Sequence, residues 1–115
     1  MRYALLIYSS DTAGDAWEQL SEEEQRSIIG EYMAVGEEAG VFGGAQLQPA
    51  ETATSVRVAA GKTLTTDGPF ADTKEVLGGL FLLEANDLDR ALELAARIPA
   101  ARMGGAVEVR PLVER

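Results

Sequence analysis

TDGPFADTKEVLGGLFLLE, residues 66–84, joins a tight polar turn and a charged cluster to the most apolar run of the chain. The turn is Asp67-Gly68-Pro69-Phe70. An aspartate side chain accepts hydrogen bonds from nearby backbone, glycine adopts dihedral angles closed to other residues, and proline fixes φ and removes a donor. Neither a helix nor a central strand can continue through these residues. Phe70 is a large apolar residue in a turn, and we expect it to fold back as an anchor.

The apolar run at residues 76–83, VLGGLFLL, predicts a strand that is buried on both faces. Successive side chains of a strand point to opposite faces, and both alternating sets are apolar here. Residues 3–8, YALLIY, follow the same pattern. We therefore predict that these two segments are the central strands of a sheet. Gly78 and Gly79 weaken a strand, and they indicate a bulge or the close approach of another group.

Two amphipathic helices are predicted on either side of the middle of the chain. The first begins after Ser21, whose spacing to Glu24 is that of a capping box, and runs to about Ala39. The second lies between residues 86 and 99, where apolar residues recur every three or four positions.

The remaining segments with strand patterns complete the predicted fold. They are residues 41–48, 54–59, 62–66 and 106–113. The middle two are joined by Ala60-Gly61 and read as a β-hairpin. Without that hairpin the order is βαββαβ. We therefore predict an α+β, ferredoxin-like fold with an extra β-hairpin, in a single domain over residues 1–115.

The predicted sheet has more apolar surface than its helices can cover. Two helices cover one face of a four-stranded sheet, and the other face would carry Leu, Ile, Phe and Tyr side chains. A stable monomer rarely leaves so large an apolar patch in water. We predict that this face packs on a second copy, sheet to sheet, with two-fold symmetry.

Composition excludes several classes of chemistry. The 115 residues include no cysteine and no histidine, which excludes disulfides, thiolate nucleophiles, imidazole bases and the commonest zinc sites. The net charge of −9 repels phosphate backbones and anionic lipid headgroups, so neither nucleic acid nor a membrane is an expected partner. We expect no cofactor and no metal site, because no spacing of acidic residues matches a known metal-binding loop. The first residues lack the pattern of a signal peptide, and we expect a cytoplasmic protein.

The run from Asp67 to Glu75, followed by Leu77-Gly78-Gly79, resembles the signature of the bacterial DGPF proteins, a branch of the YCII-related family. The resemblance extends over nearly the whole chain. It implies a single YCII-related/DGPF domain over residues 1–115 that pairs as a dimeric α-β barrel. Members of this branch are often neighbours or fusion partners of extracytoplasmic-function sigma factors, which implies a regulatory context. The resemblance implies no particular mechanism.

The wider family resembles a set of small enzymes with a proposed active site built on a His–Asp pair. The histidine of that pair belongs to the first helix. This chain has no histidine, and Ile29, Gly30 and Glu31 occupy the region where it would stand. That part of the resemblance therefore does not transfer, and Glu31 is the only titratable group among the three.

The densest polar group lies in the opening stretch and comprises Asp67, Asp72, Thr73, Lys74 and Glu75. Carboxylates beside an ammonium group shift each other's pKa values, as a general acid or base requires, and an apolar wall such as Phe70 raises a carboxylate pKa further. The alternative is a solvated ion cluster that holds the turn in shape or forms a dimer contact.

A separate group of arginines allows two readings. Arg97, Arg102 and Arg110 could form an anion site at the start of the last strand, or they could offset the acidic surface.

Three functions remain open from the sequence. The first is a small-molecule-binding or regulatory module, whose pocket is lined by Tyr8, Tyr32, Phe70 and Glu75 with the rest of the acidic cluster. The second is a small-molecule enzyme, such as an isomerase or lyase, with Asp67, Asp72 and Lys74 as candidate catalytic residues. The third is a protein–protein adaptor whose acidic surface suits a basic partner, for example a sigma factor.

Overall fold

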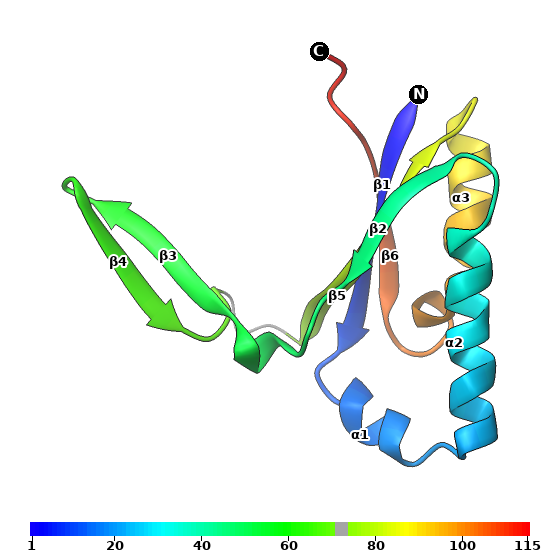
Figure 1. Cartoon of the computed structure of the whole chain (residues 1–115), viewed down its shortest axis with the longest axis horizontal. Helices are drawn as coiled ribbons and strands as arrows, with labels where there is room; N and C mark the ends of the chain where they lie inside the picture. The colour runs from blue at the N-terminus through cyan, green and yellow to red at the C-terminus, as the bar shows by residue number, and fades with distance from the viewer. Residues whose placement is uncertain (71–73) are drawn as a thin grey trace.

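The computed structural model describes residues 1–70 and 74–115. Figure 1 shows its helices and strands. They are β1 (Arg2–Ser10), α1 (Ala13–Glu18), α2 (Glu22–Gly36), β2 (Val41–Gln46), β3 (Thr54–Ala59), β4 (Lys62–Asp67), β5 (Glu75–Glu84), α3 (Leu88–Ala96) and β6 (Ala106–Pro111), with 3₁₀ turns at Ala50–Thr52 and Pro99–Ala101. None of the described helices is long and apolar enough to cross a membrane.

Strands β2, β5, β1 and β6 form an antiparallel sheet in that order. The two segments that are apolar on both faces, β1 and β5, are therefore its central strands, as predicted. The mixed α+β architecture is compatible with a ferredoxin-like fold. A central strand pairs its backbone hydrogen-bonding groups with neighbours on both sides, and a strand that is apolar on both faces suits this position because both of its faces can be covered.

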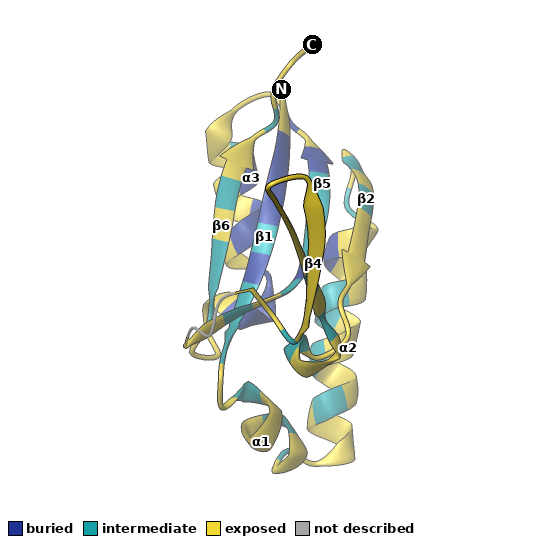
Figure 2. Ribbon diagram, turned by 90° about the vertical axis from the view of Figure 1, so that its left-hand side faces the viewer, coloured by how far each residue is buried: buried dark blue, intermediate teal, exposed yellow. Residues whose placement is uncertain are grey.

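The hydrophobic core lies between the sheet and the helices α2 and α3 (Figure 2). Leu5 of β1 stands opposite Phe81 of β5 and Val109 of β6, which places the three side chains on the same face. From the helix side, Val35 and Leu94 are fully buried in this layer.

The other face of the sheet carries no helix in the part of the chain that the structure describes (Figure 1). We call it the uncovered face. It is apolar along its central strands, because Leu6 of β1 stands opposite Leu80 of β5, and Ala4 stands opposite Leu82. The three leucines are half-buried within the single chain.

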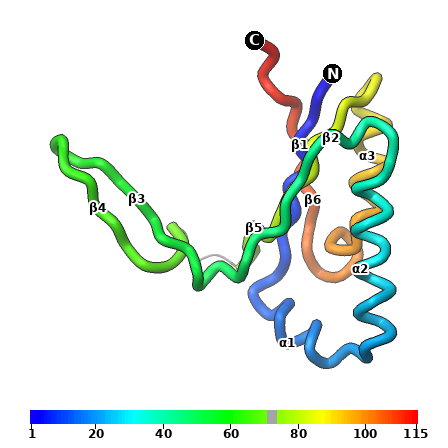
Figure 3. The backbone as a smooth tube through the Cα atoms, in the orientation of Figure 1, coloured from blue at the N-terminus to red at the C-terminus, as the bar shows by residue number. Residues whose placement is uncertain are grey.

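Strands β3 and β4 form a separate antiparallel hairpin that projects from the body of the molecule (Figures 1 and 3). We call residues 54–67 the arm. It leaves the end of the sheet on the side opposite the helices. Its tip turns at Ala60-Gly61, where both residues have positive φ, 51° and 76°. The radius of gyration is 16.0 Å, against about 13 Å for a compact domain of this length, and the arm accounts for the excess.

Helix α2 is shorter than predicted. It ends at Gly36 rather than near Ala39, because the N–H groups of Glu37 and Glu38 form the tighter bonds of a closing turn with Ala34 and Val35. Gly40 lies in the left-handed region, with φ of 94°, and a Cβ atom there would stand 2.3 Å from the carbonyl oxygen of Glu84. Glycine is thus required where the chain turns into β2.

The start of α2 is the capping box that the sequence predicts. The N–H of Glu24 donates to Ser21 Oγ at 3.0 Å, and the N–H of Ser21 donates to Glu24 Oε1 at 3.1 Å. Two backbone donors that would otherwise lack an intrahelical partner are satisfied in this way. The helix that covers one edge of the sheet therefore begins at a defined residue.

We predict that Ser21→Ala lowers the free energy of unfolding by about 1 kcal/mol, because it removes the side-chain half of this cap. Urea denaturation followed by circular dichroism measures the change. Ser27→Ala is the matched control, since Ser27 is exposed within α2 and alanine favours the helix interior. Equal stability of the two variants would contradict the role of the cap.

Candidate functional site

The charged cluster of the opening stretch divides between two strand ends. Asp67 is the last residue of β4, opposite Thr54. Glu75 begins β5, opposite Ser10, and the N–H of Asp11 donates to the carbonyl of Lys74 at 2.8 Å. The other two members, residues 72 and 73, lie outside the described residues, so the candidate Asp72 is not placed.

Every described member of the cluster is accessible to water. Asp67, Lys74 and Glu75 are exposed. Among the residues that the structure describes, no polar or charged side chain is buried, and no group of three acidic side chains is arranged to hold a metal ion. This arrangement matches the alternative of a surface cluster at the turn more closely than that of a desolvated acid–base pair.

The turn itself closes the base of the arm. Gly68 has φ of 101°, its N–H donates to the carbonyl of Ala53 at 2.6 Å, and its carbonyl accepts from Ser55 Oγ at 2.8 Å. Only glycine adopts this dihedral angle at little cost. The Gly68-Pro69 turn is thus held against both strands at the base of the arm.

Phe70 does not fold back into the core, and that expectation is wrong. Its side chain is 72% exposed, and the guanidinium carbon of Arg57 lies 4.3 Å from the centre of its ring. Such a cation–π contact is worth about 0.5–1 kcal/mol at an exposed site. The ring therefore contacts the arm.

The two tyrosines of the predicted pocket lie on opposite sides of the sheet. Tyr32 of α2 packs against the core between helices and sheet. Burial raises the pKa of its hydroxyl, and a hydrogen bond with the backbone of Ala100 partly opposes this. Tyr8 follows Ile7 in β1 and stands opposite Leu77 and Ala106, on the uncovered face. The sheet thus separates Tyr32 from Tyr8, and the single chain does not bring the predicted lining together.

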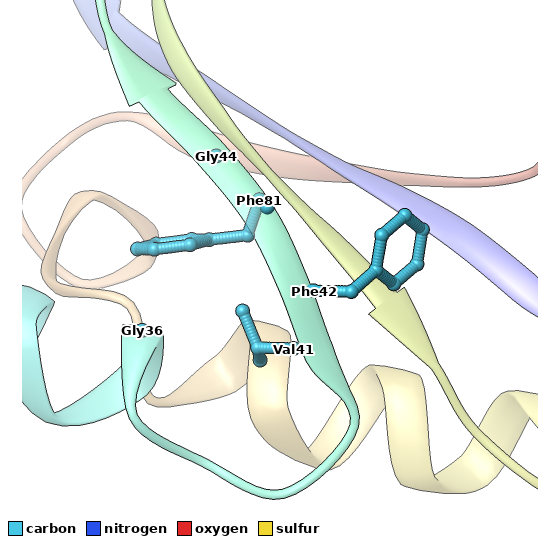
Figure 4. A pocket seen from close by; sticks show the side chains of 6 residues that line it. Gly36, Val41, Phe42, Gly44 and Phe81 are labelled. Atoms are coloured by element: carbon cyan, nitrogen blue, oxygen red, sulfur yellow. The ribbon is translucent and has the colours of Figure 1, made fainter.

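A hollow of about 360 Å³ lies along the edge strand β2 (Figure 4). Its lining is apolar and consists of Gly36, Val41, Phe42, Gly43, Gly44 and Phe81. Figure 4 shows the rings of Phe81 and Phe42 on opposite sides of β2. The sequence patterns did not predict this hollow. The paired glycines within β2 were its signal, because glycine in a strand marks a close approach by another group.

The glycines leave room for Phe81. A Cβ atom at Gly36 would stand 3.4 Å from the ring, and one at Gly44 would stand 3.0 Å from the ring and 2.7 Å from the carbonyl oxygen of Leu80. The ring therefore lies against backbone at both positions. The hollow can take an apolar group, and it offers no titratable side chain.

Each arginine of the predicted anion site has a carboxylate partner. Arg97 pairs with Glu38, Arg102 pairs with Glu31, and Arg110 Nε lies 3.0 Å from Glu108 Oε1. Arg97, Arg102 and Glu31 also line a shallow hollow with Ala34. These ion pairs favour the alternative in which the arginines offset the acidic surface. The hydrogen bond from Arg97 lowers the pKa of the Glu38 carboxyl.

The architecture defines a small α+β domain with one sheet face covered by helices and one left uncovered. The YCII-related domain model matches residues 1–115, and the chain belongs to that family. It is 40% identical, over 97% of its length, to an uncharacterised protein of Rhizobium meliloti (strain 1021), of which it covers 92%.

We predict that Gly44→Ala lowers the free energy of unfolding by about 1–3 kcal/mol, because the added methyl group overlaps the Leu80 carbonyl and the Phe81 ring. Chemical denaturation measures this. Gly30→Ala is the control: a Cβ atom there meets no heavy atom within 4 Å, and alanine stabilises a helix by up to about 1 kcal/mol relative to glycine. A stabilising effect of both substitutions would show that the β2 edge is not tightly packed.

We predict that Glu38→Gln destabilises the protein at neutral pH and that the difference from the unchanged chain shrinks on acidification. The pKa of Glu38 is lowered in the folded state, so its contribution is fully present above the ordinary value of 4.5 and is lost as pH falls through the lower, folded value. Urea midpoints measured across this range test the prediction. Glu37→Gln, at an exposed neighbour, should show a smaller dependence; an identical profile would exclude the ion pair as its cause.

Proposed function

We propose that this chain is a small-molecule-binding or regulatory module that acts as a homodimer through its uncovered sheet face. The observation that carries the proposal is the row of leucines on the central strands. Leu6, Leu80 and Leu82 lie on a face that no described helix covers. A second copy that presents the same face would remove this apolar surface from water.

The total surface area supports a dimer. The chain exposes 8112 Å², whereas a compact monomer of 12.2 kDa exposes about 6,100 Å². The excess is roughly 2,000 Å² per chain. Obligate homodimers bury about 2,000–5,000 Å² in total, or about half of that on each chain. The excess is therefore of the size that a stable dimer removes, and we propose the dimeric α-β barrel as its form.

We propose that the ligand lies between the paired faces, at the end of β1 nearest the turn. Tyr8 offers a hydroxyl there beside an apolar surface. Opposite it, β5 has a bulge at Gly78, where a Cβ atom would meet nothing closer than 3.9 Å. Lys74 and Glu75 lie at the polar rim of the same end. These groups suit a small molecule with an apolar body and one polar end.

A binding role is favoured over an isomerase or lyase because the described candidate catalytic residues, Asp67 and Lys74, are exposed. Water around a carboxylate or ammonium group stabilises its charged form and weakens its use as an acid or base. We place the chain in the DGPF branch because of residues 67–75, and in a reducing compartment such as the cytoplasm because it lacks cysteine. A regulatory task beside a sigma factor is the context that this branch suggests.

We predict that the unchanged chain is a dimer at micromolar concentration and that Leu80→Asp converts it to a monomer, because the dimer would bury the added carboxylate without a partner. Sedimentation velocity measures the mass. A metabolite screen by thermal shift should give hits with the unchanged chain, and those hits should be lost with Leu80→Asp.

Leu92→Asp is the matched control, since Leu92 is an exposed leucine of α3 and lies outside the proposed interface. It should leave both the dimer and the hits in place. A monomeric unchanged chain would refute the dimer. Conversion of a bound compound to product, lost in Asp67→Asn while the compound still binds, would replace the binding role with the enzymatic one.

A further inference from the structure

The arm carries an apolar stripe that no described part of the chain covers. Val56 and Val58 are 61% and 69% exposed. They stand opposite Thr65 and Thr63, so that one face of the arm is a continuous row of β-branched side chains. An isolated two-stranded hairpin is only marginally stable in water, and it usually gains stability by packing its apolar face on another element.

The arm also differs in charge from the rest of the chain. Residues 54–67 contain Arg57, Lys62 and one acidic residue, Asp67, at the base of the arm. The other 101 residues carry 18 of the 19 acidic residues and eight of the ten basic ones, which gives them a net charge of −10. A basic arm on an acidic body is attracted to the body of another molecule of the same kind.

We propose that the arm docks on a second copy of this chain, with Val56 and Val58 in the contact. The inference rests on the proposed homodimer and adds a second contact to it. The arm projects on the same side as the uncovered face (Figures 1 and 2), so a copy seated on that face lies beside the arm. By symmetry each body receives the arm of the other, and a dimer contains two such contacts.

The two faces of the arm have different tasks in this arrangement. Val56 and Val58 form the buried contact. Arg57 and Leu64 stand opposite each other on the reverse face, together with Lys62 and Ala59. Arg57 and Lys62 therefore stay outside the buried contact and act at longer range, where they speed association and set its dependence on salt more than they set its final strength. The contact of Arg57 with Phe70 holds the reverse face to the turn at the base of the arm.

The test is the dissociation constant of the dimer, measured by sedimentation equilibrium for Val56→Asp/Val58→Asp and for Leu64→Asp. The valine pair should raise the dissociation constant by at least about 100-fold, because two apolar contacts are lost and two carboxylates would be buried. Leu64→Asp changes the same residue class to the same charge on the reverse face of the same arm. It should raise the constant by less than about threefold.

The result separates this inference from the proposed dimer. If the valine variant keeps the dissociation constant of the unchanged chain while Leu80→Asp is monomeric, the dimer stands and the docking of the arm is overturned. A monomeric unchanged chain overturns both. Hydrogen–deuterium exchange gives a readout that needs no variant: the amides of residues 54–67 should be protected above the dissociation constant and should exchange freely below it. Protection that is independent of concentration also overturns the docking.

Discussion

The structure depends on one constraint, which is that both central strands of the sheet are apolar on both faces. Each needs cover on two sides, and helices α2 and α3 supply it on one. Leu5 and Leu83 are completely buried beneath the helices, whereas Leu6 and Leu82, on the adjacent positions of the same strands, are half-buried. Because of this asymmetry, the uncovered face, from which the arm projects, is the face on which a second copy could pack.

The distribution of polar groups bears on function more than the fold does. The described acidic residues are exposed or half-buried, and the arginines near the helices are paired with glutamates. A fold of this kind supports many activities, so the role of the protein depends on the groups at its site. The hollow at β2 and the end of the uncovered face both offer apolar walls, and neither combines them with a buried titratable group among the described residues. Recognition of a ligand suits these surfaces better than proton transfer does.

Local patterns were sufficient for most of the secondary structure. The capping box of Ser21 and Glu24 correctly predicted the start of α2. The segments that are apolar on both faces correctly predicted β1 and β5 as the central strands of the sheet. Patterns failed to predict the position of a side chain where that position depends on contacts between distant segments. Tyr32 and Tyr8 were assigned to one pocket, but the sheet lies between them. Phe70 was expected to fold back as an anchor, but its ring is exposed and contacts Arg57 of the arm.

The amino-acid sequence alone determined the strands, the two long helices, the position of the central strands and the excess of apolar surface over helical cover, because these follow from side-chain periodicity and composition. It did not predict the short helix α1 or the 3₁₀ turns. The tertiary structure decided which face of each strand the helices cover, the space that Gly36 and Gly44 leave for Phe81, and the projection of the arm away from the body. These features depend on packing between segments far apart in the chain. The turn at residues 67–70 belongs to the stretch that predicted the fold. In three dimensions it forms the base of the arm, because Gly68 is hydrogen-bonded to Ala53 and Ser55 across the hairpin.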